Sequence, residues 1–254
     1  MIATGVLKAE WTKFSSIRAT MVLSLAVVAA SGFFGWTFAN MAAHEYATAS
    51  AQERLDFLPL DQVMRGMLLV QLLISALGVL VATSEYGSGT LGPSLAAVGR
   101  RSRLVIAKAG MTALVALPVS VAGIGLMFVT SQVTLAAQGA PYLMPGDPDA
   151  LLALLLGPVV FTLLALFGLA LGLLLRGTAA AVNVSSTFLL MPVLAPIFPD
   201  FLSRLLTAYW PNGAGFRAVT SRSDLPPVLS FGLLVGFVAV MHVAAFTRFT
   251  RRDA

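Results

Sequence analysis

Six long apolar stretches dominate the sequence and limit what the chain can fold into. A bilayer core about 30 Å thick is crossed by about 20 apolar residues in an α-helix. The stretches cover residues 19–39, 63–84, 104–136, 150–175, 178–198 and 227–247. The third is overlong, which predicts a tilted or projecting helix. Because the chain lacks the alternating segments of a membrane β-barrel, the sequence predicts an all-α integral membrane protein with six spans.

The composition agrees with a chain that lipid covers. Only 11% of its 254 residues are charged and 58% are hydrophobic, whereas about a quarter of the residues of a soluble domain are charged. The formal net charge of +5 suits an anionic membrane surface better than nucleic acid, because patches that mix aromatic and basic residues are missing. The chain has no cysteine, which excludes disulfides, thiol chemistry and cysteine-based metal sites.

The basic residues are unevenly divided between the two sides of the expected spans. With a cytoplasmic N-terminus, eleven Lys and Arg residues lie inside and five lie outside or near the outer interface. The inner set is Lys8, Lys13, Arg18, Arg100, Arg101, Arg103, Lys108, Arg176, Arg248, Arg251 and Arg252, and the outer set is Arg54, Arg65, Arg204, Arg217 and Arg222. The positive-inside rule therefore predicts that both termini are cytoplasmic.

Glycine and proline occur inside several spans. Two glycine pairs, Gly168/Gly172 and Gly232/Gly236, have the GxxxG spacing that lets helices approach closely. For either pair this predicts tight packing within one bundle or a seam between two copies of the chain. Mild kinks are expected at the prolines inside spans, which are Pro118, Pro158, Pro192 and Pro196.

The stretch "EYGSGTLGPSLAAVGRRSR" has the glycine spacing of a dinucleotide-binding loop, at Gly87, Gly89 and Gly92. That fingerprint needs a preceding strand and an acidic residue about 20 positions later. Here the preceding apolar run is too long for a strand, and the next acidic residue after Glu85 is Asp147. We therefore expect the end of a membrane helix followed by a short cytoplasmic helix with a basic exit.

Two further segments are amphipathic. In residues 4–18, Leu7, Trp11 and Phe14 recur at helical spacing, which predicts a helix on the inner leaflet or an extension of the first span. Residues 199–227 are too broken to span and too apolar for an ordinary loop. They are expected either to dip into the bundle or to form a surface helix with an aromatic anchor.

Three polar residues lie within the spans, and two roles stay open for each. His242 is expected to be hydrogen-bonded inside the bundle or to act as a ligand or proton carrier. Gln71 and Asn183 are expected to bond between helices or to face a substrate path.

The segments "LKAEWTKFSSIRAT" and "EYGSGTLGPSLAAVGRRSRLVIAKAG" resemble the membrane permeases of bacterial ATP-binding-cassette exporters, the class called type V or ABC-2-like. The resemblance covers the whole chain. In that family the loop between the second and third spans forms a coupling helix that docks on the ATPase. The resemblance implies this role for residues 85–103, with contacts from Glu85, Gly87, Gly89, Thr90, Leu91, Leu95, Arg100, Arg101 and Arg103. It also implies that segment 199–226 re-enters the outer leaflet, with an outer gate at Tyr209, Trp210, Pro211 and Asn212.

The resemblance also implies partners and a location. They are a separate ABC ATPase, a second permease copy or paralogue, membrane lipid and a hydrophobic or amphipathic substrate, in the bacterial cytoplasmic membrane. The chain has no G-x-x-x-x-G-K-[ST] loop, so ATP and Mg²⁺ are expected on the partner, and no cofactor, metal or catalytic residue on this chain. The alternatives are a secondary transporter and an intramembrane enzyme, although no ionisable residue lies at the middle of an expected span.

Overall fold

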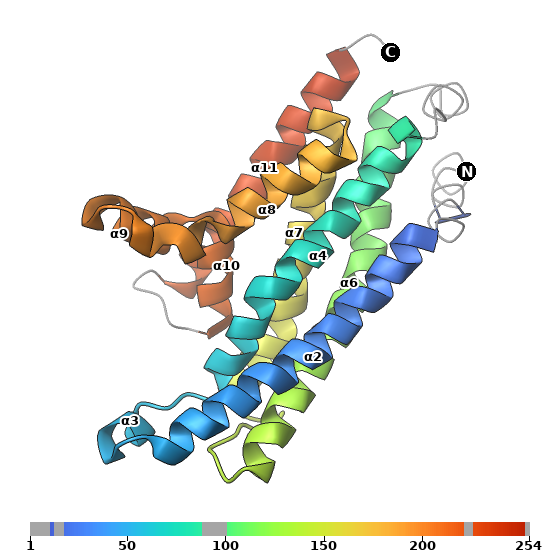
Figure 1. Cartoon of the computed structure of the whole chain (residues 1–254). Helices are drawn as coiled ribbons and strands as arrows, with labels where there is room; N and C mark the ends of the chain where they lie inside the picture. Colours follow the sequence, from blue (N-terminus) through green and yellow to red (C-terminus); the bar gives the residue numbers. More distant parts are fainter. Residues whose placement is uncertain (1–10, 13–17, 88–100, 221–225, 252–254) are drawn as a thin grey trace.

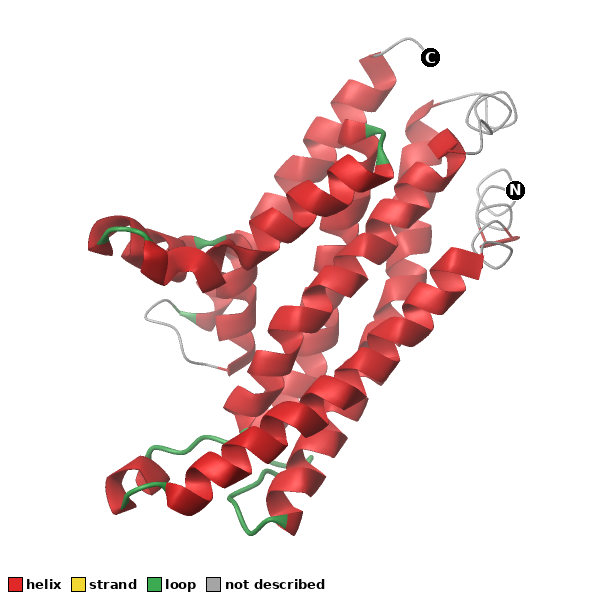
Figure 2. Cartoon of the chain, in the orientation of Figure 1, coloured by secondary structure: helices red, strands yellow, loops and turns green. Residues whose placement is uncertain are grey.

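The computed structural model describes residues 11–12, 18–87, 101–220 and 226–251, and in these ranges the chain is helical without any strand (Figure 2). Six helices are long and apolar enough to cross a membrane, the fifth together with the short 3-10 turn η1 (Ala195–Ile197). They are α2 (Arg18–Thr48), α4 (Leu60–Gly87), α6 (Arg101–Ala137), α7 (Pro148–Leu175), α8 (Thr178–Leu194) and α11 (Pro227–Arg251). The predicted fold class, an all-α membrane protein, is confirmed.

Several helix ends differ from the expected spans. The first helix continues to Thr48 rather than to 39, and the second continues to Gly87 rather than to 84. Hydropathy marks only the membrane-crossing part, whereas backbone hydrogen bonding carries a helix onward beyond the apolar run. In contrast, α8 ends at Leu194 rather than at 198, because two prolines tighten its last turn. The interfacial helix expected at 4–18 lies almost wholly outside the described residues.

Helices begin and end so that the chain crosses the bundle in alternating directions (Figure 1). The start of α2, the end of α4, the start of α6 and the end of α11 lie together at one end. The opposite end carries the short helix α3 (Ala51–Leu55) and the α6–α7 connection. Between α8 and α11 the chain forms α9 (Asp200–Tyr209), which projects sideways, and α10 (Pro211–Thr220).

The short helix α3 has its own N-terminal cap. The Ser50 side chain accepts a hydrogen bond from the backbone N–H of Glu53, and the Glu53 carboxylate accepts one from the backbone N–H of Ser50 at 2.7 Å. The hydrogen bond from the Ser50 backbone N–H to the charged carboxylate lowers the pKa of Glu53, and the Ser50 side chain lowers it further. The Arg54 guanidinium lies over the Tyr46 ring and donates to the Ala47 carbonyl. The connection from α2 to α4 is therefore held to the end of α2.

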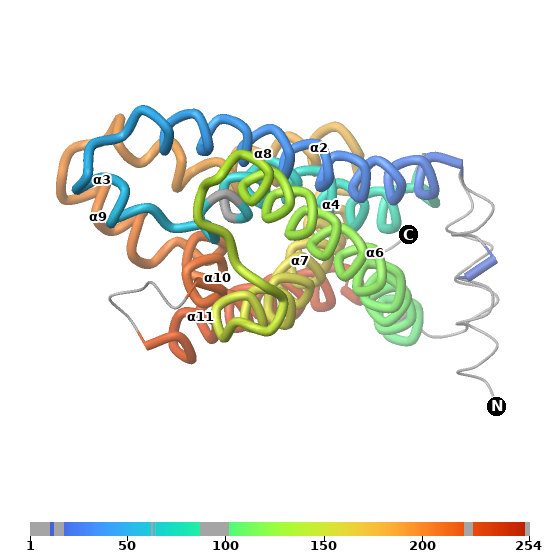
Figure 3. Tube along the Cα trace, turned by 90° about the horizontal axis from the view of Figure 1, so that it is seen from below, coloured from blue at the N-terminus to red at the C-terminus, as the bar shows by residue number. Residues whose placement is uncertain are grey.

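Helix α7 lies at the centre of the bundle, between α4, α6 and α11 (Figure 3). It also packs against α8 and α10. Large side chains such as Phe161, Leu164 and Phe167 are almost completely buried in the main apolar core. A helix that is apolar on all sides is typical of a central position.

Glycines bring the backbones of α4 and α7 into contact. A methyl group at Gly78 would collide with the Ala165 carbonyl oxygen, and one at Gly168 would collide with the Ser75 carbonyl oxygen. At Gly172 it would lie 2.5 Å from the Ala82 Cβ. The Gly168/Gly172 pair is thus used for packing within the bundle, the first of the two uses that its spacing predicted.

The second glycine pair has a different environment. A methyl group at Gly232 or Gly236 would meet no atom within 4 Å. The pair lies on the outer side of α11, where Val235, Val240 and Val243 are also exposed. Exposed apolar side chains likewise cover the outer sides of α2 and α6. Large exposed apolar surfaces on membrane-length helices face lipid, and the chain is a multi-pass membrane protein.

The two glycine pairs give a matched test of this packing. We expect Gly168→Ala to push α4 and α7 apart and to cost about 1–3 kcal/mol of stability, the usual effect of overpacking. Gly236→Ala should be neutral or slightly stabilising, because alanine favours the helix and meets no neighbour. Thermal unfolding of both purified variants in the same detergent measures the difference. Equal stability of the two variants would contradict the close contact.

Candidate functional site

The connection between α4 and α6 is anchored by a buried ion pair. The Lys108 Nζ atom lies 3.0 Å from the Glu85 Oε2 atom, and both side chains are at most 4% exposed. Lys108 also donates to the Val81 carbonyl oxygen at 3.4 Å. Because an unpaired charge is costly in a low-dielectric interior, each of these side chains depends on the other. The pair fixes the last turn of α4 against the second turn of α6.

In this geometry the Glu85 carboxylate lies against Lys108 of α6, and its expected contact with a partner protein stays a prediction. Glu85 is only 3% exposed. The reason is the additional turn of α4, which keeps residue 85 in the helix and directs its side chain toward α6. Sequence reasoning placed Lys108 only among the inner basic residues and missed the pair. The one sign of the pair in the sequence is that Glu85 follows one apolar run and Lys108 lies near the start of the next.

The other residues expected to couple to an ATPase are only partly described. Gly87 is the last residue of α4, Arg101 is the first residue of α6, and Arg103 is exposed in the first turn of α6. The remaining ones lie outside the described residues, namely Gly89, Thr90, Leu91, Leu95 and Arg100.

The turn between α7 and α8 lies beside the end of α4. Arg176 has the left-handed backbone conformation, with φ of 58°, and its guanidinium carbon lies 5.9 Å from the centre of the Tyr86 ring. The Thr178 hydroxyl donates to the Thr83 hydroxyl at 2.8 Å. At this end of the bundle, polar contacts therefore connect the end of α4 to the start of α6 and to the turn between α7 and α8.

Polar contacts continue along α4 and α8 through the apolar interior. The hydroxyl oxygens of Ser75 and Ser185 lie 2.6 Å apart, and the Gln71 amide donates to the Leu189 carbonyl oxygen at 3.3 Å. Gln71 thus bonds between helices, one of its two expected roles. Asn183 lies exposed on α8. The His242 Nδ1 atom lies 3.0 Å from the Val238 carbonyl oxygen of its own helix.

The residues expected to form an outer gate are brought together at the α9–α10 corner. Tyr209 ends α9 and is 53% exposed, whereas Trp210 and Pro211 are half-buried and Asn212 is completely buried. The rest of α10 is almost entirely buried, and α10 packs against α7 and α11. Its small residues Gly213, Ala214 and Gly215 allow this fit.

The Trp210 ring lies against an aromatic group between α7, α8 and α11. Its centroid is 4.7 Å from that of Phe188, which stacks on Phe237 at 4.8 Å and lies 5.0 Å from Phe167. Centroid distances of this size are favourable for aromatic pairs. The segment was expected either to dip into the bundle or to form a surface helix with an aromatic anchor. At the described corner, Trp210 packs against the bundle.

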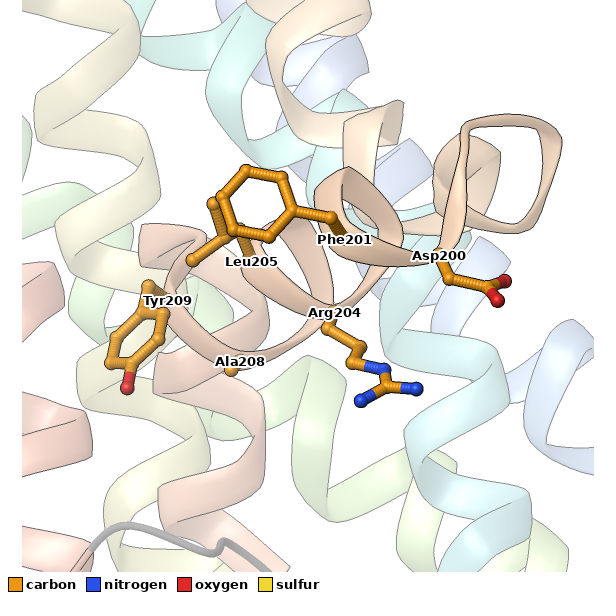
Figure 4. A pocket seen from close by; sticks show the side chains of 6 residues that line it. All are labelled: Asp200, Phe201, Arg204, Leu205, Ala208 and Tyr209. Atoms are coloured by element: carbon orange, nitrogen blue, oxygen red, sulfur yellow. The ribbon is translucent and has the colours of Figure 1, made fainter.

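Helix α9 has an open depression along one side, with a volume of about 490 Å³. The lining residues all come from this helix and are Asp200, Phe201, Arg204, Leu205, Ala208 and Tyr209 (Figure 4). Phe201 and Leu205 point to the same side, while the Arg204 side chain extends away from them. One helix face without an opposing wall is an amphipathic surface rather than a closed binding site.

No family model matches the chain, and no curated protein sequence matches it significantly. The likeness of its two motifs to exporter permeases therefore remains an expectation.

The buried ion pair predicts that removing one of its two charges costs more stability than removing both. Lys108→Met leaves the Glu85 carboxylate buried without its cation, and we expect a loss of about 3–5 kcal/mol. The double variant Glu85→Gln/Lys108→Met should lose much less, because no buried charge remains. Arg103→Met, at an exposed position of the same helix, is the control. The fraction of protein that stays monodisperse after heating measures all three variants. A double variant that loses as much stability as Lys108→Met, or more, would exclude a paired role.

Proposed function

We propose that this chain is the membrane permease subunit of an ATP-binding-cassette exporter and works with a separate ATPase. The observation that carries the proposal is the buried Glu85–Lys108 pair. It joins α4 and α6 on either side of the basic connection between them. Two membrane helices fixed to one another in this way move together when a partner protein moves their connection. The resemblance of the motif at 85–103 supplies the kind of partner, an ABC ATPase.

The proposed orientation has this end of the bundle in the cytoplasm of a bacterial cell, with both termini on that side. Its support is the charge of the helix ends that meet there (Figure 1). Arg103 lies in the first turn of α6, Arg176 follows α7, and Arg248 lies in the last turn of α11. Anionic cytoplasmic lipid headgroups favour basic residues at this side.

In the proposed mechanism, ATP and Mg²⁺ bind to the ATPase subunits, and this chain supplies the path through the membrane. Closure of two ATPases moves the connection at 85–103 in each of two permeases, which are two copies or two paralogues. A cavity between the permeases receives the substrate from the cytoplasm or the inner leaflet. A hydrophobic or amphipathic cargo such as a drug, lipid or peptide fits best, because the exposed side chains of the described spans are mainly apolar.

The orientation is tested with single cysteines, which are informative because the chain has none. Gln52→Cys on α3 should react in intact cells with a thiol reagent that does not cross membranes. Ala179→Cys, exposed at the start of α8, should react only after the cells are opened. Both results follow from the proposed orientation, in which α3 faces outward and the α7–α8 turn faces the cytoplasm. The reverse pattern would overturn the orientation.

The docking role is tested by reversing charge at the start of α6. The tagged chain, purified in mild detergent from its native membrane, should carry a vanadate-sensitive ATP-hydrolysing activity. Arg101→Glu/Arg103→Glu should reduce the recovered activity at least tenfold, which corresponds to a loss of about 1.4 kcal/mol of binding free energy, because like charges brought together at an interface repel. Arg248→Glu, at the same end of the bundle but on α11, is the control and should recover the full activity.

Two outcomes of this measurement contradict the proposal. If the purified chain carries no vanadate-sensitive activity and transport instead follows an ion gradient, the chain is a secondary transporter. If the Arg101→Glu/Arg103→Glu variant and the Arg248→Glu control recover the same activity, the start of α6 is not the docking site.

A further inference from the structure

Pro192 leaves one backbone carbonyl of α8 without its helical partner. A proline has no N–H group, so the carbonyl of the residue four positions earlier, Phe188, cannot form its usual hydrogen bond. The Trp210 indole N–H donates to this Phe188 oxygen at 2.9 Å. A side chain from the α9–α10 corner therefore replaces the hydrogen bond that the proline removes.

The next carbonyl of α8 is bound in a similar way. The Asn212 amide donates to the Leu189 oxygen at 2.9 Å and to the Gln71 Oε1 atom at 2.9 Å. Gln71 in turn donates to the same Leu189 oxygen. Both amide side chains are completely buried. The last turns of α8, the start of α10 and the middle of α4 are thus joined at one point.

This point of attachment is incompletely satisfied. The Asn212 Oδ1 atom is buried and accepts no hydrogen bond from the described residues. The orientation of the amide is fixed by its two acceptor neighbours, so exchanging oxygen and nitrogen would lose both bonds. A buried acceptor without a donor costs free energy. A state in which Asn212 leaves this position and becomes hydrated regains that cost.

The neighbouring helix α9 is held only weakly. Leu206 is its one buried residue, while Phe201 is 76% exposed. The helix projects sideways from the bundle (Figure 1). Segments with few buried contacts open at low free energy. The bonds at the corner are accordingly the main polar attachment of the outer segment to α8.

We infer that Trp210 and Asn212 form a releasable latch on the last turns of α8, and we call their bonds to the Phe188 and Leu189 carbonyls the α8 latch. Opening of the α8 latch frees α9 and the start of α10 to move during the transport cycle. This inference deepens the proposed function and rests on it for the role in transport. The physical opening itself can be measured without any transport assay.

The measurement is the reaction rate of a buried cysteine beside the latch. Gly213 is buried, and a Cβ atom there would lie 3.5 Å from the Pro192 ring and 3.4 Å from the Arg217 guanidinium, which are ordinary contact distances. We expect Gly213→Cys to react slowly with a maleimide in native membranes. Adding Trp210→Phe keeps a ring but removes the N–H donor. The rate should then rise about fivefold, the equivalent of one hydrogen bond.

Two controls separate the latch from general loosening. Ala116→Cys is buried in α6, away from the corner, and its rate should not change with Trp210→Phe. In a Pro192→Ala background, residue 192 regains its N–H and can bond to Phe188, so the effect of Trp210→Phe at position 213 should largely disappear. Equal rate increases at 116 and 213, no increase at 213, or an undiminished effect with Pro192→Ala would each overturn the latch.

The role in transport is tested on the purified complex that carries vanadate-sensitive ATPase activity. Trapping nucleotide with vanadate should change the reaction rate of Gly213→Cys at least about threefold, while the rate of Ala116→Cys stays constant. An active complex in which trapping leaves the rate at 213 unchanged would overturn the transport role of the latch. Absence of any vanadate-sensitive activity would instead contradict the proposed function, while the effect of Trp210→Phe would still decide whether the latch exists.

Discussion

The contact between α4 and α7 determines how the rest of the bundle is arranged. Moving an apolar side chain from lipid into a helix contact gains little free energy, because both surroundings are apolar. Membrane helices therefore associate mainly through close packing and hydrogen bonds. Gly78 on α4 and Gly168 on α7 bring the two backbones together, each facing a carbonyl group of the other helix. Helix α7 then presents its remaining sides to α6, α10 and α11. The other helices can therefore be arranged around this pair.

A second constraint, satisfaction of the backbone, explains the irregular part of the chain. Proline in a membrane helix removes a hydrogen bond that water cannot replace, so another protein group must supply the donor. At Pro192 that donor is Trp210, which comes from the corner between α9 and α10. The proline in α8 and the inward turn of the outer segment thus depend on one another. This is why α10, which contains Asn212 and two glycines, is buried instead of lying at the surface.

Much of the fold could be predicted from the sequence, because the six spans follow from hydropathy alone. Hydropathy did not reveal that Glu85 is buried, since a charged residue at the end of an apolar run usually marks the exit of a helix from the membrane. Its partner Lys108 lies in the next span, and a pair between helices has no signature in either one. Gly168/Gly172 and Gly232/Gly236 have identical spacing, yet only the first pair meets a neighbouring helix. The spacing shows that two glycines lie on one face of a helix. Whether that face packs against another helix depends on the tertiary structure. Within the outer segment, the resemblance singled out Trp210 and Asn212, but the carbonyl groups of α8 that accept their hydrogen bonds could not be predicted.

Helix α4 connects the two candidate sites. At its cytoplasmic end in the proposed orientation, Glu85 pairs with Lys108 of α6, and Thr83 is bonded to Thr178 of α8. At the other end of this row of contacts, Gln71 bonds to the Leu189 carbonyl and to Asn212. The fourteen positions from 71 to 85 correspond to about 21 Å along an α-helix.

Because α8 is bonded to α4 at both ends of this row and at Ser75 between them, a displacement of α4 relative to α7 carries α8 with it. The α10 helix packs on α11 and α7, and its Asn212 is also bonded to Gln71 of α4. Such a displacement therefore strains the bonds of Trp210 and Asn212 to the Phe188 and Leu189 carbonyls. A movement that begins at the α4–α6 connection therefore has a physical route to the α8 latch.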